Sequence, residues 1–175
     1  PFGRRAGYLY ETVRGIDASP VRPLGAGAQR IVCRHIFTDD AHDPAVLEGA
    51  LYTLVEQAGR RLRDRRLAAR RVAVRLGFSD GLIRIRQRAL HPATANDLTL
   101  FARARAALYL AWQRRVRIRH LELISDRLIY PPAQRSLFPE DRRALHRRNR
   151  LVAAVDAIRD RFGPGAIKVG RTLAV

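Results

Sequence analysis

The distribution of apolar residues divides the chain into segments with two different periods. In some segments apolar and polar residues alternate, which is the period of a β-strand, and in others apolar residues recur every three or four positions, as in an α-helix. The alternating segments are residues 30–37, 71–78, 82–88 and 116–123, and the helical ones are residues 2–16, 44–62, 95–112 and 145–162. The pattern therefore predicts a helix, then β-α-β-β-α-β, then a final helix.

Local signals support the ends of several predicted elements. Asp43 followed by Pro44 is an N-cap and first-turn pair ahead of the second helix. Thr94 and Asp97 have the spacing of a capping box ahead of the third helix. The Ser-Asp-Gly sequence at 79–81 separates two alternating segments, which predicts a β-hairpin.

Each predicted strand has one apolar face, which the helices must cover. This favours an α+β fold with one antiparallel four-stranded sheet and two helices on one of its faces, the ferredoxin-like β-α-β-β-α-β arrangement, extended by a short N-terminal helix and a C-terminal helix. In the last strand the apolar positions change parity between Ile118 and Leu121, which predicts a β-bulge there.

The composition adds a strong positive charge to this picture. The net charge is +18, and all but one of the basic residues are arginine. Such a charge favours a polyanionic partner, with nucleic acid as the first candidate. Nucleotide bias in a genome also produces an arginine excess, and scattered arginines also keep a surface hydrated, so these two interpretations stay open beside the first.

The same composition excludes several classes of protein. Cys33 is the only cysteine, so no internal disulfide can form and we expect a reducing compartment such as the cytoplasm. No apolar run is long enough to span a bilayer, so we expect no membrane partner. The chain has no methionine and begins within a helical pattern, so we expect it to be part of a longer protein.

Arginines alternate with apolar residues along the predicted hairpin. Like charges placed side by side on a sheet are unfavourable unless a counter-charge binds there, so we expect a polyanion-binding face opposite the helices. An ordinary hydrated outer face is the alternative. The residues predicted to form this DNA-binding face are Arg71, Arg75, Arg84, Arg86 and Arg88, with Arg34 and Arg117 as neighbours.

The absence of aromatic residues from this face indicates which type of nucleic acid it binds. Sheets that read exposed RNA bases present aromatic side chains, and this face offers none. Arginines without aromatic residues suit the phosphates of a duplex. A ferredoxin-like RNA-binding module remains the alternative.

The sequence contains no set of residues with catalytic spacing. The histidines at 35, 42, 91, 120 and 146 have no ligand spacing with one another or with Cys33. Without a cluster of carboxylates, a two-metal site cannot be assembled. We therefore expect no catalytic residue, no metal ligand and no cofactor in this chain.

Three parts of the chain resemble Y-family translesion DNA polymerases. "FGRRAGYLYETVRGID" resembles the end of their thumb, residues 29–130 resemble their little finger, and "LFPEDRRALHRRNRLVAAVDAIRDRFGPGAI" resembles their C-terminal tail. The resemblance implies the following divisions: thumb end 1–17, linker 18–28, DNA-binding little finger 29–130, clamp-binding motif 131–138, and C-terminal helix and tail 139–175.

The resemblance implies a non-catalytic domain that holds template-primer DNA through its backbone. A parent of this kind is a DNA-directed DNA polymerase that uses Mg²⁺ in a palm domain upstream. His35 stands where the family commonly has glutamate, and Glu122 where it usually has glycine. These differences leave a second hypothesis open, a catalytically inactive polymerase-like accessory subunit.

The stretch "QRSLF" between two proline breaks resembles the bacterial sliding-clamp-binding consensus. Its candidate contact residues are Gln134, Ser136, Leu137 and Phe138. Large apolar side chains can fill a partner's pocket, and the flanking prolines favour an extended form. In the alternative interpretation, Leu137 and Phe138 fold back on the following helix as a hydrophobic staple. The expected partners are thus duplex DNA and a sliding clamp, and the chain is expected to be a monomer.

Overall fold

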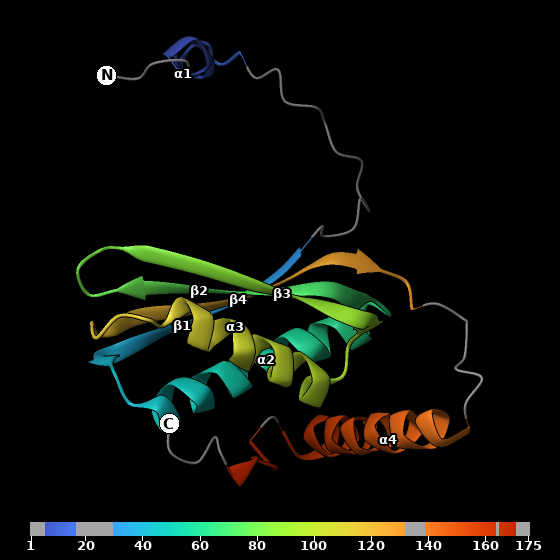
Figure 1. Ribbon diagram of the computed structural model, residues 1–175. Coiled ribbons are helices and arrows are strands. Elements are labelled where there is room, and N and C mark those ends of the chain that lie inside the picture. Colours follow the sequence, from blue (N-terminus) through green and yellow to red (C-terminus); the bar gives the residue numbers. More distant parts are fainter. Residues whose placement is uncertain (1–5, 17–29, 132–138, 164, 171–175) are drawn as a thin grey trace.

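The computed structural model describes residues 6–16, 30–131, 139–163 and 165–170. The helices and strands follow the predicted order (Figure 1). They are α1 Ala6–Val13, β1 Arg30–Ala41, α2 Pro44–Asp64, β2 Ala68–Phe78, β3 Ile83–Thr94, α3 Asp97–Ala111, β4 Ile118–Ile129 and α4 Pro139–Phe162. Strands β1, β3 and β4 continue several residues beyond the C-terminal ends that the alternation alone indicated.

A four-stranded sheet in the order β1-β4-β2-β3 forms the centre of the fold. All neighbouring strands are antiparallel, so β4 and β2 are central while β1 and β3 form the two edges. Helices α2 and α3 lie side by side on one face of the sheet (Figure 1). The predicted α+β, ferredoxin-like class is confirmed.

The core lies between the sheet and these two helices. The predicted inward residues of β2, which are Val72, Val74, Leu76 and Phe78, are at most 2% exposed. In β4 the predicted bulge is present, because His120 pairs with Gly77 and Ile118 with the next residue, Phe78. Arg119 is therefore the extra residue, and it shifts the apolar parity of the strand.

The helix starts show one confirmed cap and one correction. Asp43 caps α2, with its Oδ1 accepting a hydrogen bond of 2.8 Å from the Ala45 amide. The predicted cap of α3 at Thr94 is wrong, because Thr94 still pairs with Ala69 in the sheet. The cap is Asn96, whose side chain accepts hydrogen bonds from the amides of the second and third residues that follow it.

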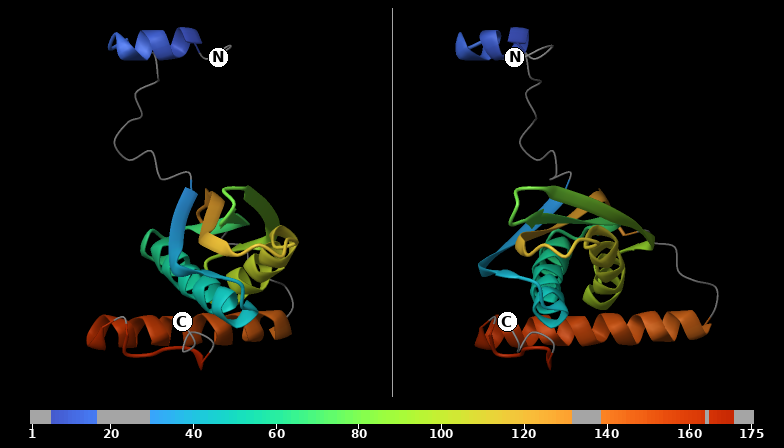
Figure 2. Two further views of the ribbon diagram at one scale, coloured as in Figure 1. Left: turned by 90° about the vertical axis from the view of Figure 1, so that its left-hand side faces the viewer. Right: turned by 60° about the vertical axis from the view of Figure 1, so that its left-hand side comes forward.

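Helix α4 forms a third layer on the far side of α2 and α3 from the sheet (Figure 2). Hydrogen-bonded ion pairs attach it to the domain. Arg63 Nε of α2 donates to Asp156 Oδ2 at 2.6 Å, and Arg159 Nη2 of α4 donates to Glu56 Oε1 at 2.8 Å. Between residues 146 and 162 of α4, where burial is described, Val152 is the only buried residue. Ion pairs, rather than apolar burial, thus orient this helix.

Arg63 is shared by two carboxylates at the junction of α2, α3 and α4. Its Nη1 lies 2.7 Å from Asp97 Oδ1, while Nε binds Asp156. Asp97 is only 6% exposed, and Gly59 makes room for it, since a Cβ at Gly59 would collide with Asp97 Oδ1. Burial raises the pKa of Asp97 to about 6, Arg63 opposes the rise, and Asp156 and Glu56 add to it.

We expect Asp97→Asn to change how stability depends on pH. Because the pKa of Asp97 rises from 3.8 to about 6 on folding, the folded protein holds a proton there that the unfolded chain releases. The stability of the parent relative to the variant should therefore fall as the pH rises through this window, by up to about 3 kcal/mol at roughly 1.4 kcal/mol per pKa unit.

Urea denaturation of both proteins between pH 4 and 7 measures this difference. Asp64→Asn is the control, because Asp64 is 58% exposed and pairs with Arg60 only one helical turn away. Its free energy of unfolding should follow that of the parent. Parallel curves for the parent and Asp97→Asn would contradict the expectation.

Candidate nucleic-acid interface

The open face of the sheet, which α2 and α3 leave uncovered, consists of four cross-strand rows. Two rows place a carboxylate of β4 between arginines of β1 and β2: these are Arg34, Glu122, Arg75 and Ile85, and Arg30, Asp126, Arg71 and Ala89. The other two rows are Val32, Ile124, Ala73 and Gln87, and Ile36, His120, Gly77 and Ile83. The open face is therefore a mixed surface of charged and aliphatic residues.

Glu122 joins the two sides of the first row. Arg75 Nη1 donates to Glu122 Oε2 at 3.0 Å, and Arg34 donates to Glu122 Oε1. Glu122 is 2% exposed. Burial raises the pKa of this carboxyl, but the hydrogen bonds and charges of both guanidinium groups outweigh it, so the net shift is downward.

Asp126 pairs with one arginine of the second row. Arg71 Nε donates to Asp126 Oδ1 at 2.7 Å and Arg71 Nη2 donates to Oδ2, a bidentate pair. The hydrogen bond to Asp126 raises the pKa of Arg71 further. The arginines predicted at 34, 71 and 75 are thus on the open face, but each is already paired with a carboxylate.

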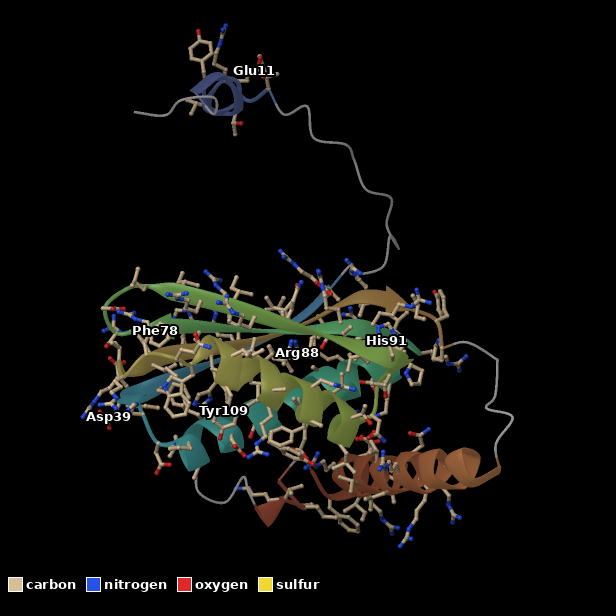
Figure 3. All side chains as sticks on the ribbon, viewed as in Figure 1. Glu11, Asp39, Phe78, Arg88, His91 and Tyr109 are labelled. Atoms are coloured by element: carbon tan, nitrogen blue, oxygen red, sulfur yellow. The ribbon has the colours of Figure 1, made fainter. Side chains whose placement is uncertain are left out.

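The structure contradicts the predicted position of Arg84, Arg86 and Arg88. In the β2–β3 register they lie opposite Leu76, Val74 and Val72, and residues paired in this way share a face. All three arginines therefore point to the helix-covered side, as Figure 3 shows for Arg88. Ile83 and Ile85 take the open face, where they are 47% and 49% exposed.

The register of the hairpin explains this correction. Gly77 pairs with Ile83, so residues 78–82 form the connection and set which β3 residues share a face with the core residues of β2. Because the side-chain period is two, a shift of one residue in that connection would exchange the two faces of β3. The alternation of β3 was predicted correctly, and its orientation was not.

Arg84, Arg86 and Arg88 nevertheless form an exposed strip along the β3 edge, which we call the edge strip. None of them makes an ion pair with any residue that the structure describes. Alternate residues of a strand are about 6.8 Å apart, so the strip is a regular row of free positive charges. Arg117 is also exposed and lies beside the hairpin turn, where its carbonyl accepts a 2.9 Å hydrogen bond from the Ser79 amide.

Three residues of the open face were missed as candidate site residues. Glu122 and Asp126 neutralise arginines, and their spacing along one strand was a visible signal that these arginines have partners. His120 lies directly over Gly77, since a Cβ there would collide with the imidazole ring. Only the cross-strand register brings His120 to this glycine.

Other predicted features lie outside this surface. Gln134, Ser136, Leu137 and Phe138 are beyond the described residues, so clamp binding stays a prediction. In the described part of the chain, no group of three or more His, Cys, Asp or Glu side chains could hold a metal ion. No described helix is both long enough and apolar enough to cross a membrane.

Comparison with known proteins identifies relatives of the chain. The model of the impB/mucB/samB family C-terminal domain matches residues 28–137. The DNA polymerase IV of Dehalococcoides mccartyi (strain ATCC BAA-2266) is 30% identical over 171 residues, which cover 97% of this chain and 43% of the relative. That of Caulobacter vibrioides is 31% identical over 167 residues, covering 94% and 40%. The chain thus spans less than half of these relatives.

A solved structure shares the fold at low sequence identity. The chain matches a DinB family error prone DNA polymerase from Sulfolobus solfataricus with a TM-score of 0.52 and 15% identity. The match covers 73% of this chain and 37% of the solved one. At this identity the likeness concerns the fold alone.

We expect Glu122→Gln to destabilise the protein by about 1–3 kcal/mol at neutral pH, because it weakens hydrogen bonds to two charged groups. Since folding lowers the pKa of Glu122, its contribution is complete above the ordinary value of 4.5 and is lost as the pH falls through the lower folded value. Chemical denaturation at several pH values should show a difference that shrinks in acid.

The control is Asp40→Asn, which removes a surface pair with Arg119 at 3.5 Å. Such pairs contribute at most about 1 kcal/mol. A difference between Glu122→Gln and the parent that stays constant from neutral to acid pH would show that the carboxylate charge is not what stabilises the row.

Proposed function

Because the chain belongs to the impB/mucB/samB family and carries the C-terminal domain of Y-family DNA polymerases, as its motifs predicted, we propose that this domain binds duplex DNA without sequence preference. The phosphate backbone is the recognised part. The observation that carries this proposal is the edge strip of Arg84, Arg86 and Arg88, three regularly spaced guanidinium groups without an acidic partner in the described structure.

Free arginines and arginines paired with a carboxylate contribute differently to DNA affinity. A free arginine that neutralises a phosphate releases the counterions condensed on the DNA, and this release dominates affinity at low salt. Arg34, Arg71 and Arg75 already have carboxylate partners, so they add less net charge. Each guanidinium still has N–H groups left for a phosphate, so these residues orient the backbone rather than supply most of the attraction.

The composition of the open face also disfavours the recognition of exposed RNA bases. Single-stranded RNA is commonly bound by stacking on aromatic side chains. Among the residues paired across the open face, His120 is the only ring, and it lies between Ile36 and Gly77. Duplex DNA is therefore favoured over RNA, and competition of bound duplex by single-stranded RNA tests the alternative.

We expect the triple change Arg84→Ala, Arg86→Ala and Arg88→Ala to weaken the salt dependence of duplex binding. At about 0.9 units of log–log slope per phosphate, the slope should flatten by roughly 2 to 3 units. Fluorescence anisotropy with two unrelated duplex sequences at several salt concentrations measures the slope and the lack of sequence preference.

A charge-matched control separates local contact from overall charge. Arg147, Arg148 and Arg150 are exposed residues of α4, and their replacement by Ala removes the same charge. This control should change the slope by less than about one unit, since no phosphate contact is lost there. Equal flattening by both triples would mean that net charge alone, and not the edge strip, binds DNA.

For the whole protein, we propose the role that the family suggests. The domain would hold template-primer DNA for a polymerase whose Mg²⁺-binding palm lies in the part of the relatives that this chain does not span. An inactive accessory subunit is the alternative, and the presence of metal-binding carboxylates upstream distinguishes them. With a net charge of +18, self-repulsion favours a monomer bound to the DNA of the bacterial nucleoid.

We further propose that residues 134–138 dock the chain on a sliding clamp. The motif lies in the connection between β4, which ends at Ile129, and α4, which begins at Pro139. A second attachment raises the local concentration of DNA around the domain and compensates for a grip limited to the backbone. Leu137 and Phe138 are the anchors and Gln134 sets the register.

We expect Leu137→Ala with Phe138→Ala to weaken binding to a purified bacterial sliding clamp by at least about 30-fold, or roughly 2 kcal/mol, because two apolar anchors are lost. Isothermal titration calorimetry measures this. Arg135→Ala is the matched control, since the clamp consensus leaves that position free. Equal clamp binding by the folded double variant and the parent would show that the motif match is a coincidence.

A further inference from the structure

Helix α4 exposes its apolar residues instead of burying them against the domain. Leu151, Ile158 and Phe162 are 57%, 36% and 67% exposed. Their spacing of seven and four residues places them on one side of the helix, with the half-buried Val155 between them. We call this set the α4 stripe; it extends about 16 Å along the helix axis at 1.5 Å per residue.

Both acidic residues of α4 between residues 146 and 162 face the domain. Asp156 pairs with Arg63 of α2, and Asp160 pairs with Arg60 of the same helix. Residues 146–162 contain no other acid. The sides of α4 that do not contact α2 therefore carry no negative charge between these residues.

Exposed arginines border the α4 stripe. In residues 146–162 they are Arg147, Arg148, Arg150 and Arg161. The guanidinium of Arg161 lies 5.3 Å from the ring centroid of Phe162, so charge and apolar surface meet directly at the end of the stripe. This arrangement of an apolar centre with a basic rim is that of a protein-binding surface.

The described C-terminal tail does not cover this surface. The tail is attached at Arg159, whose Nη2 donates to the Ile167 carbonyl at 3.0 Å, and Val169 packs against the core. Arg159 lies about 100° around the helix from Ile158. The tail thus occupies the neighbouring side of α4 and leaves Leu151 and Phe162 exposed.

We propose that the α4 stripe binds an acidic amphipathic helix of a partner protein. The partner's apolar side chains cover Leu151, Ile158 and Phe162, and its flanking carboxylates pair with the arginine rim, as e and g residues do in a coiled coil. A helix of about three to four turns matches the length of the stripe. This proposal is independent of the proposed DNA binding, which uses the edge strip of β3 and not α4.

Charge complementarity selects this occupant over the others. A second copy of the chain would bring two arginine rims together, which is unfavourable at a net charge of +18. A DNA backbone would pair with the rim but would leave the apolar side chains uncovered. An acidic amphipathic helix satisfies both the centre and the rim of the surface.

Three synthetic peptides test the proposal by fluorescence anisotropy at near-physiological salt. One is an amphipathic helix with Leu on one face and Glu beside it, the second has Lys in place of Glu, and the third has the acidic composition in scrambled order. The first peptide is expected to bind at least tenfold more tightly than either of the others. Equal binding by the scrambled acidic peptide would overturn the proposal, because attraction would then be charge alone.

Variants locate the binding surface. Leu151→Ser with Phe162→Ser should weaken binding of the first peptide at least tenfold, while Ile83→Ser with Ile85→Ser, which alters similarly exposed aliphatic residues on the sheet, should not. Circular dichroism should match the parent in both variants, and duplex DNA binding should match the parent in the α4 variant. Unchanged peptide affinity in the folded α4 variant overturns the proposal without affecting the DNA-binding assignment.

A charge exchange tests the rim. Replacing Arg147, Arg148 and Arg150 by Glu should reverse the preference, so that the Lys-containing peptide binds more tightly than the Glu-containing one. An unchanged preference would overturn the role of the rim. Sedimentation of the parent should show a monomer, and a dimer abolished by Leu151→Ser with Phe162→Ser would overturn the proposal in favour of a second copy.

Discussion

The antiparallel register of β2 against β4 and β3 is the constraint on which the rest of the molecule depends. It places Val72, Val74 and Leu76 under the helices, and it places Arg71 and Arg75 on the open face beside the acids of β4. The same register carries the edge strip of β3 to the helix-covered side. Since the side-chain period of a strand is two, one register decides the core, the ion-paired rows and the position of the free charge together.

Pairing divides the arginines of this strongly basic chain into two kinds. On the open face Glu122 pairs with Arg34 and Arg75, and Asp126 pairs with Arg71, so the sheet tolerates several guanidinium groups side by side. The edge strip has no such partner in the described structure, and it supplies net charge. A high arginine content therefore does not by itself locate an anion-binding surface; the distribution of buried carboxylates decides which arginines remain available.

Ion pairs hold the third layer in place, whereas apolar burial holds the core together. Helix α4 is attached by ion pairs from Glu56, Arg60 and Arg63 of α2, and these pairs set its rotation about its own axis. Its apolar residues are left toward solvent as a consequence. The ion pairs that attach α4 to the domain therefore also leave the α4 stripe exposed. The exposed stripe is then available to a partner.

The sequence by itself determined the element order, the Asp43 cap, the inward residues of β2 and the bulge of β4, because periodicity and capping are local properties. It also determined the family, through motifs spread along the chain. Tertiary structure alone decided the strand order, the face of β3 that carries Arg84, and the pairing of Glu122 with Arg34 across strands. These depend on register and on contacts between distant residues, and alternation in one strand does not specify which of its two faces meets the helices.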